Sequence, residues 1–175
     1  MPPRPARSRL FALAWLCAGF AWTCGALAAT AAGDFPLAGT WNLVAADVQH
    51  PDGSRTRDYG AAPRGRLMID RQGRYSLQIF RTDRPRFAGG DKAKGSAEEY
   101  RAAAMGSSTH FGTIRIDPAR HLLVFHIEGA SFPNWEGQQQ SRRYEWQGDV
   151  LSYRVPPRPD GNVPITVWRR VAPAR

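Results

Sequence analysis

The segment RLMIDRQGRYSLQIF, residues 66–80, holds two short apolar runs on either side of a turn. In the second run Tyr75, Leu77 and Ile79 alternate with more polar residues, which is the period of a strand with one buried face. Gln72-Gly73 between the runs is typical of a tight connection between antiparallel strands. The segment therefore predicts a β-hairpin.

The same pattern continues along the chain from Leu37, with turn residues separating short apolar runs. Further strands are predicted over residues 40–46, 55–59, 109–117, 121–128, 138–147, 150–155 and 164–171. A single sheet of this length would curl, and closing it removes its edges. We therefore predict an all-β fold, an antiparallel up-and-down β-barrel of eight to ten strands with one short helix. A two-sheet sandwich is the alternative.

The helix is predicted over residues 97–105, after a polar, glycine-containing loop over residues 82–96. Ser96 suits the N-cap, Glu98 and Glu99 favour the first turn, and Gly106 can end the helix. We predict that this helix is a lid over one end of the barrel, with Tyr100 or Met105 reaching inward. The alternative is a functionally neutral insertion.

Residues 1–32 have the order of a secretory signal peptide: three arginines, a short apolar run over residues 10–21 and an alanine-rich stretch. About 12 apolar residues are too few to cross a bilayer comfortably, so a permanent anchor is the weaker interpretation. We predict that the segment is cleaved, which leaves a domain over residues 33–175. The protein would then be exported to the periplasm or secreted, without stable membrane insertion.

Cleavage would remove both cysteines, Cys17 and Cys24, so that disulfides, thiolate metal sites and a cysteine nucleophile are excluded from the mature domain. It would also remove the three arginines and lower the formal charge from +9 to +6. The basic residues that stay are dispersed, which favours a solvated basic surface over nucleic-acid binding.

Motifs for hydrolases, kinases and dehydrogenases are missing from the sequence, and no cofactor is expected. His121 and His126 are five residues apart on one predicted strand, which places them on opposite faces. We expect no metal site.

Several short motifs resemble those of a known family. Gly39-Thr40-Trp41 resembles the G-x-W start of lipocalins, and the later motifs resemble the bacterial and fungal lipocalin-like domain family. These later motifs are Tyr59-Gly60, Pro63-x-Gly65-x-Leu67, Gly73-Arg74-Tyr75-Ser76, the glutamate-containing helix before Gly106, Phe111-Gly112-Thr113, His126, Ser131-Phe132-Pro133-Asn134-Trp135-x-Gly137, Arg142, Gly148-Asp149-x-Leu151 and Trp168-Arg169-Arg170. The resemblance spans residues 37–171 and implies a barrel with an internal cavity. It implies the fold more directly than the function.

The candidate ligand-binding residues are Tyr75, Tyr100, His110, His126, Trp135 and Arg142. His110 shares a predicted inward face with Gly112 and Ile114, where a hydrogen-bonded core histidine is the plain alternative. His126 has two possible orientations. It points outward if Leu123, Phe125 and Ile127 form the core face, and it lines the cavity with Glu128 if the alternate residues do.

Arg142 alternates with Tyr144 and Trp146, so we predict that it enters the barrel beneath Tyr144. A buried arginine needs an anionic or carbonyl partner. The cation that packs over Trp41 at the closed end of lipocalins is assigned to Arg169 or Arg170. Trp135 either closes the barrel mouth with Tyr100 or plugs the hydrophobic bottom.

These features favour a barrel that binds one small hydrophobic or amphipathic molecule in its interior. One alternative is a cofactor-free isomerase or cyclase that uses a cavity histidine or glutamate as acid or base. Another is a fully packed barrel without a ligand site.

Overall fold

A computed structural model describes residues 34–172. The predicted signal peptide lies outside the described residues. The strands are β1 (Gly39–Gln49), β2 (Arg55–Arg57), β3 (Arg64–Ile69), β4 (Arg74–Phe80), β5 (Ser107–Asp117), β6 (Leu122–Ala130), β7 (Gln139–Gln147), β8 (Val150–Arg154) and β9 (Val163–Arg170). The helices are α1 (Ala97–Met105) and two 3₁₀ turns, η1 (Lys92–Lys94) and η2 (Pro133–Trp135).

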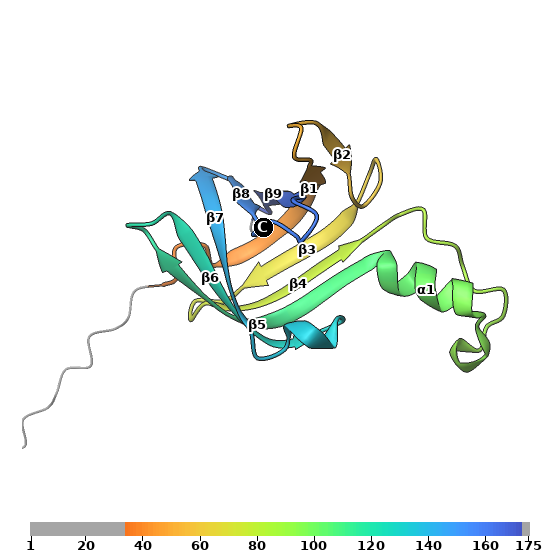
Figure 1. Cartoon of the computed structure of the whole chain (residues 1–175). Coiled ribbons are helices and arrows are strands. Elements are labelled where there is room, and N and C mark those ends of the chain that lie inside the picture. The colour runs from red at the N-terminus through yellow and green to blue at the C-terminus, as the bar shows by residue number, and fades with distance from the viewer. Residues whose placement is uncertain (1–33, 173–175) are drawn as a thin grey trace, which may run out of the picture. The chain divides into compact units, whose positions relative to one another are not determined.

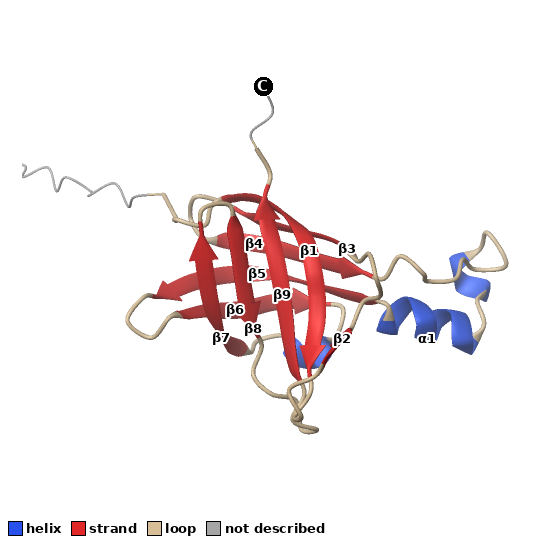
Figure 2. Cartoon of the chain, turned by 90° about the horizontal axis from the view of Figure 1, so that it is seen from above, coloured by secondary structure: helices blue, strands red, loops and turns tan. Residues whose placement is uncertain are grey.

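The strands form one closed antiparallel barrel (Figures 1 and 2). Neighbours pair in the order β1-β3-β4-β5-β6-β7-β8-β9, and β9 pairs back with β1 to close the ring. Strand β2 pairs only with β1 and stays outside the ring. The predicted up-and-down barrel is therefore confirmed, and the sandwich alternative is wrong.

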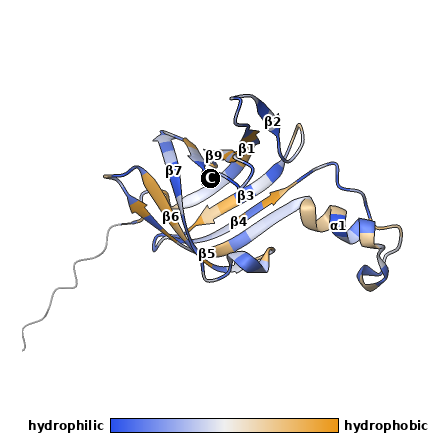
Figure 3. Cartoon of the chain, in the orientation of Figure 1, coloured by the Kyte–Doolittle hydropathy of each residue, from blue (hydrophilic) through white to orange (hydrophobic). Residues whose placement is uncertain are grey.

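Alternation along the strands fills the barrel interior. In Figure 3 hydrophobic stretches lie on β3, β4 and β6, whereas β2 and β7 are mostly hydrophilic. On β6 the residues Leu123, Phe125 and Ile127 are buried, so His126 and Glu128 face outward. On β1 a bulge between Leu43 and Ala45 changes the phase, from Trp41 inward before it to Ala46 and Val48 inward after it.

One end of the barrel is closed by Trp41, which is fully buried. Its Nε1 donates a hydrogen bond to the Leu37 carbonyl oxygen at 3.0 Å. The Arg170 guanidinium lies 4.1 Å from the Trp41 ring centroid and donates to the Ala38 carbonyl oxygen. The predicted cation over Trp41 is confirmed, with Arg170 in that place.

The connections alternate between the two ends of the barrel, because neighbouring strands are antiparallel. Short turns over residues 70–73, 118–121 and 148–149 lie at the closed end with Trp41. The long connections over residues 50–63, 81–106, 131–138 and 155–162 lie at the opposite end, which we call the open end.

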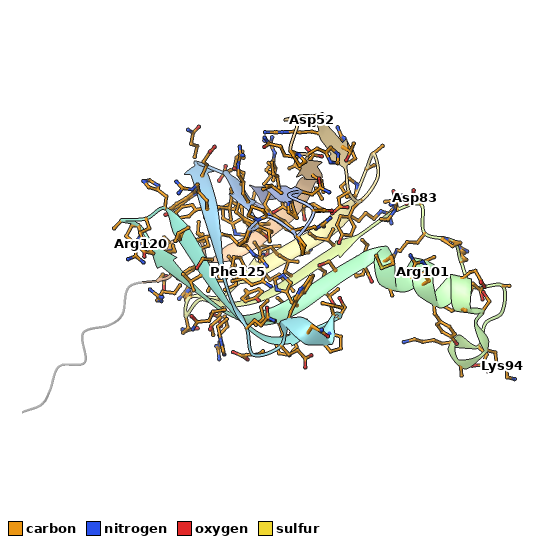
Figure 4. The ribbon with its side chains drawn as sticks, viewed as in Figure 1. Asp52, Asp83, Lys94, Arg101, Arg120 and Phe125 are labelled. Atoms are coloured by element: carbon orange, nitrogen blue, oxygen red, sulfur yellow. The ribbon has the colours of Figure 1, made fainter. Side chains whose placement is uncertain are left out.

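Helix α1 has the predicted bounds. Ser96 is its N-cap, and the Ser96 and Glu99 side chains form a reciprocal capping box. The prediction that α1 is a lid with an inward-reaching side chain is wrong, because Tyr100 is 40 % and Met105 68 % exposed. No residue of α1 is buried; the Tyr100 ring packs on Phe87 within the same segment, with the ring centroids 5.5 Å apart, and its hydroxyl donates to the Lys92 carbonyl oxygen. Residues 82–106 thus form an arm beside the barrel, with Lys94 near its tip (Figure 4).

Candidate functional site

A pocket of about 500 Å³ enters the barrel from the open end. Its rim is formed by the ends of β4 and β5 and by the loops after β2, β6 and β8. Its lining residues are Asp58, Tyr59, Leu77, Ile79, Ser108, His110, Trp135, Gln138, Gln140, Arg142, Tyr153, Val155, Pro156, Pro157, Arg158, Pro159, Pro164 and Thr166. Most of the wall is apolar, and a few polar groups converge at its deeper part.

Arg142 is the charged residue at the deep part of the pocket. It projects inward from β7 and is only 4 % exposed, as the alternation of this strand predicts. Its guanidinium carbon lies over the Phe125 ring, 4.0 Å from the centroid, and 5.2 Å from the Tyr153 ring centroid. Phe125 is fully buried in the barrel core.

The hydrogen bonds of Arg142 all use one nitrogen. Nη2 donates to Gln140 Oε1 at 2.9 Å and faces His110 Nε2 at 3.4 Å. Nε is buried without a partner, and within residues 34–172 no carboxylate forms an ion pair with this guanidinium. The Tyr153 hydroxyl in the same pocket wall is also buried without a hydrogen-bond partner.

His110 joins the pocket to the core beneath it. Burial, together with the Arg142 charge, lowers the pKa of His110 to about 3, so its ring is neutral near pH 7. Because a guanidinium can only donate, Nε2 faces Arg142 as an acceptor and Nδ1 carries the ring proton. Nδ1 then donates to the Tyr75 hydroxyl oxygen at 2.7 Å, and burial raises the pKa of Tyr75.

A glycine opposite Ile127, Gly112, permits a close approach of β5 and β6 two residues after His110. Gly112 has φ +153°, and a β-carbon there would lie 2.0 Å from the His126 carbonyl oxygen. Only glycine permits this approach, which accompanies the β-bulge between Phe111 and Gly112. The local sequence thus holds the His110 side chain at a constrained place in the barrel wall.

The rim of the pocket contains an aromatic side chain and an ion pair. Trp135 stands edge-on to the His110 ring at 6.1 Å and is supported by Phe132 at 5.5 Å. It therefore lies at the mouth, and the interpretation as a plug at the closed bottom is wrong. Arg158 Nη2 contacts Asp58 Oδ2 at 2.9 Å and links two rim loops.

The structure brings three of the six predicted site residues to the pocket wall: His110, Trp135 and Arg142. Tyr75 is buried behind His110 and supports it without lining the pocket. Two assignments are corrected. His126 is exposed on the outer face because β6 buries its odd-numbered residues, and Tyr100 is held within the arm by its contact with Phe87.

Sequence reasoning missed several residues of the pocket. Gln140 and Tyr153 were detectable by strand alternation, since Gln140 lies two residues before Arg142 and Tyr153 two residues after the core residue Leu151. The proline-rich rim over residues 155–159 carries no such periodicity. Its place at the pocket follows only from closure of the barrel.

The chemistry available in the pocket is dominated by hydrogen-bond donors. Within residues 34–172 there is no group of three or more metal-ligating side chains. His126 and Glu128, considered as an acid–base pair, both lie on the outer face and not in the pocket. At its deep part the pocket offers the Arg142 cation, the neutral His110 ring and the unpartnered Tyr153 hydroxyl, beside an apolar wall.

None of the helices in the described part of the chain is long and apolar enough to cross a membrane.

Comparisons with known proteins agree with this architecture. No curated protein matches the chain. Residues 38–171 match the family described as the lipocalin-like domain. Because this match covers more than half of the chain, the protein belongs to the lipocalin-like domain family.

Proposed function

We propose that the barrel binds one small hydrophobic or amphipathic molecule in the pocket at its open end. The observation that carries the proposal is the pocket itself, about 500 Å³ in a barrel whose opposite end is filled by Trp41 and Arg170. Pockets that bury a small organic molecule have volumes of about 300 to 1,000 Å³. This volume also argues against the fully packed barrel.

The wall near the mouth suits an apolar body. Leu77 and Ile79 from β4, Val155 and the prolines after it form this part of the wall, and Trp135 stands at its edge. Transfer of apolar surface from water into such a wall is favourable by about 25 cal/mol per Å². A ligand with an apolar chain or ring system is therefore favoured over a sugar or a nucleotide.

Binding is better supported than catalysis. An isomerase or cyclase without a cofactor needs an acid or base whose pKa lies near the working pH. His110 is the one histidine that lines the pocket in the described part of the chain, and its pKa of about 3 makes it a poor proton donor there. Its Nδ1 proton is already directed to Tyr75.

Export belongs to the same proposal. It rests on the sequence of residues 1–32, in which arginines precede a short apolar run and an alanine-rich stretch. A binding protein outside the cytoplasm would meet its ligand in the surrounding medium or at a membrane surface.

The proposal is tested with N-phenyl-1-naphthylamine, an uncharged probe whose fluorescence rises in apolar surroundings. We expect saturable binding of one probe per chain. Ser108→Trp should abolish it by filling the pocket, whereas Ser76→Trp, on the outer face of neighbouring β4, should leave it unchanged. Equal binding to both variants would place the probe outside the barrel and overturn the proposal.

A further inference from the structure

We infer that the ligand carries a carboxylate and that Arg142, at the deep part of the pocket, is the residue that binds it. This inference rests on the proposed function and adds the chemical class and the orientation of the ligand. Its apolar part would extend past Leu77 and Ile79 toward Trp135 at the mouth.

The donors around Arg142 exceed the acceptors that the protein supplies. A guanidinium has five N–H groups. In the described part of the chain, Nη2 has the partners Gln140 and His110, whereas Nε is buried without one. The Tyr153 hydroxyl adds another buried donor without a partner. Buried donors are rarely left unsatisfied in native proteins, so an acceptor is missing from this site.

The charge balance gives the sign of the missing group. The charged residues of the pocket lining are Asp58, Arg142 and Arg158, and Asp58 is already paired with Arg158 at the rim. His110 is neutral, which leaves the Arg142 charge uncompensated in a low-dielectric interior. Burial of an unpaired charge is costly, and an anion that enters the pocket would remove this cost.

The size of the charge and the geometry of the guanidinium favour a carboxylate. A phosphate monoester carries about −1.5 to −2 charges, which one buried arginine does not balance. A carboxylate carries a single charge, and its two oxygens match the parallel N–H groups of arginine. The Tyr153 hydroxyl can donate to the same group.

The test compares three probes with the same ten-carbon tail: decanoate, decan-1-ol and decyltrimethylammonium. Calorimetric titration of the whole protein at low salt and about pH 8 should give the order decanoate, then decan-1-ol, then the ammonium. We expect decanoate to bind about tenfold or more tightly than decan-1-ol, the effect of one charge-assisted hydrogen-bonded contact.

Matched variants locate the preference. Arg142→Met should remove at least about tenfold of the decanoate affinity and leave decan-1-ol within about twofold. Tyr153→Phe, which deletes a hydroxyl without a partner, should weaken decanoate selectively. Arg143→Met, the neighbouring exposed arginine on β7, should change neither probe.

The outcomes separate the two proposals. If decan-1-ol binds wild type as tightly as decanoate does, or if the decanoate preference survives in Arg142→Met, the carboxylate inference is overturned and the hydrophobic pocket stands. If none of the three probes binds, the proposed function fails, and the inference that rests on it fails too. The wild-type comparison needs no variant, so poor folding of a mutant cannot obscure the answer.

Discussion

Replacing Arg142 by methionine should stabilise the protein in the absence of ligand. Arg142 is 4 % exposed, its Nε has no partner, and within residues 34–172 its guanidinium forms no ion pair. Methionine has a similar unbranched stem and can fill the same space over Phe125 without a charge to desolvate. The function of this side chain and the stability of the barrel are thus expected to oppose each other.

The magnitude follows from opposing contributions at the site. Removing a guanidinium from water costs several kcal/mol even after relaxation. The protein returns about 1 to 2 kcal/mol through the Phe125 and Tyr153 rings and about 1.5 to 3 kcal/mol through the Gln140 hydrogen bond. The desolvation cost and these favourable interactions are therefore of similar size. Replacing a buried charge by an apolar residue typically raises the free energy of unfolding by about 1 to 4 kcal/mol. We expect Arg142→Met to raise the free energy of unfolding by about 1 to 2 kcal/mol.

Urea unfolding followed by circular dichroism measures this change, and thermal unfolding should show a melting temperature higher by about 3 °C or more. Arg143→Met is the matched control, because that side chain is exposed and should shift stability by no more than about 0.5 kcal/mol. A loss of more than about 1 kcal/mol in Arg142→Met would show that the guanidinium is already compensated within the protein. The site would then need no bound anion, contrary to the inference above.

Four further predictions concern other parts of the chain. Because burial lowers the pKa of His110 to about 3, only the unfolded chain gains a proton at this residue as the pH falls below about 6.5. The free energy of unfolding of the wild type, compared with that of His110→Gln, should therefore drop by about 2 kcal/mol between about pH 7.5 and about pH 5. Parallel pH profiles of the two proteins would contradict this. Trp41→Ala should lower the free energy of unfolding, measured in urea, by about 3 to 5 kcal/mol, because it empties the closed end of the barrel. A loss below about 1 kcal/mol would show that this end is not packed as described. Replacing residues 82–106 by a short Gly-Ser linker should change the free energy of unfolding by less than about 1 kcal/mol and leave the release rate of N-phenyl-1-naphthylamine unaltered. A tenfold faster release in stopped-flow fluorescence would show that α1 does act as a lid. Amino-terminal sequencing of protein from its own host should find a start between Ala29 and Asp34 and no thiol, whereas a mature chain that retains Cys17 would contradict export.

Strand alternation was sufficient to predict most of the strands, because they bury one face and expose the other. The barrel was favoured over a two-sheet sandwich because closing a long sheet removes its edges. The hairpin around Gln72-Gly73 and the bounds of α1 agree with the structure, since each depends on neighbours in the sequence: a turn dipeptide, or an N-cap with its capping box. The bulge in β1 was not predicted. It depends on pairing with β9, more than 100 residues away, and alternation within β1 alone does not reveal it.

The site was predictable only in part for the same reason. Arg142 and His110 were found because each alternates with clear inward neighbours. His126 was ambiguous because Leu122, Leu123, Val124 and Phe125 are apolar in both phases, and pairing with β5 and β7 decides between them. The stripe on α1 predicted burial against the barrel mouth, but no residue of the helix is buried, and Tyr100 packs on Phe87 within the same arm.

A crystal structure of the protein with ω-bromodecanoate would test the central claim most directly, because the bromine atom locates the tail independently by its anomalous scattering. The account predicts the carboxylate within hydrogen-bonding distance of the Arg142 guanidinium and the bromine toward Trp135 at the open end. It would be contradicted by a bromine at the deep end with the carboxylate in solvent. It would equally be contradicted by an empty pocket with the molecule bound in the outer groove between Met68 and Phe80.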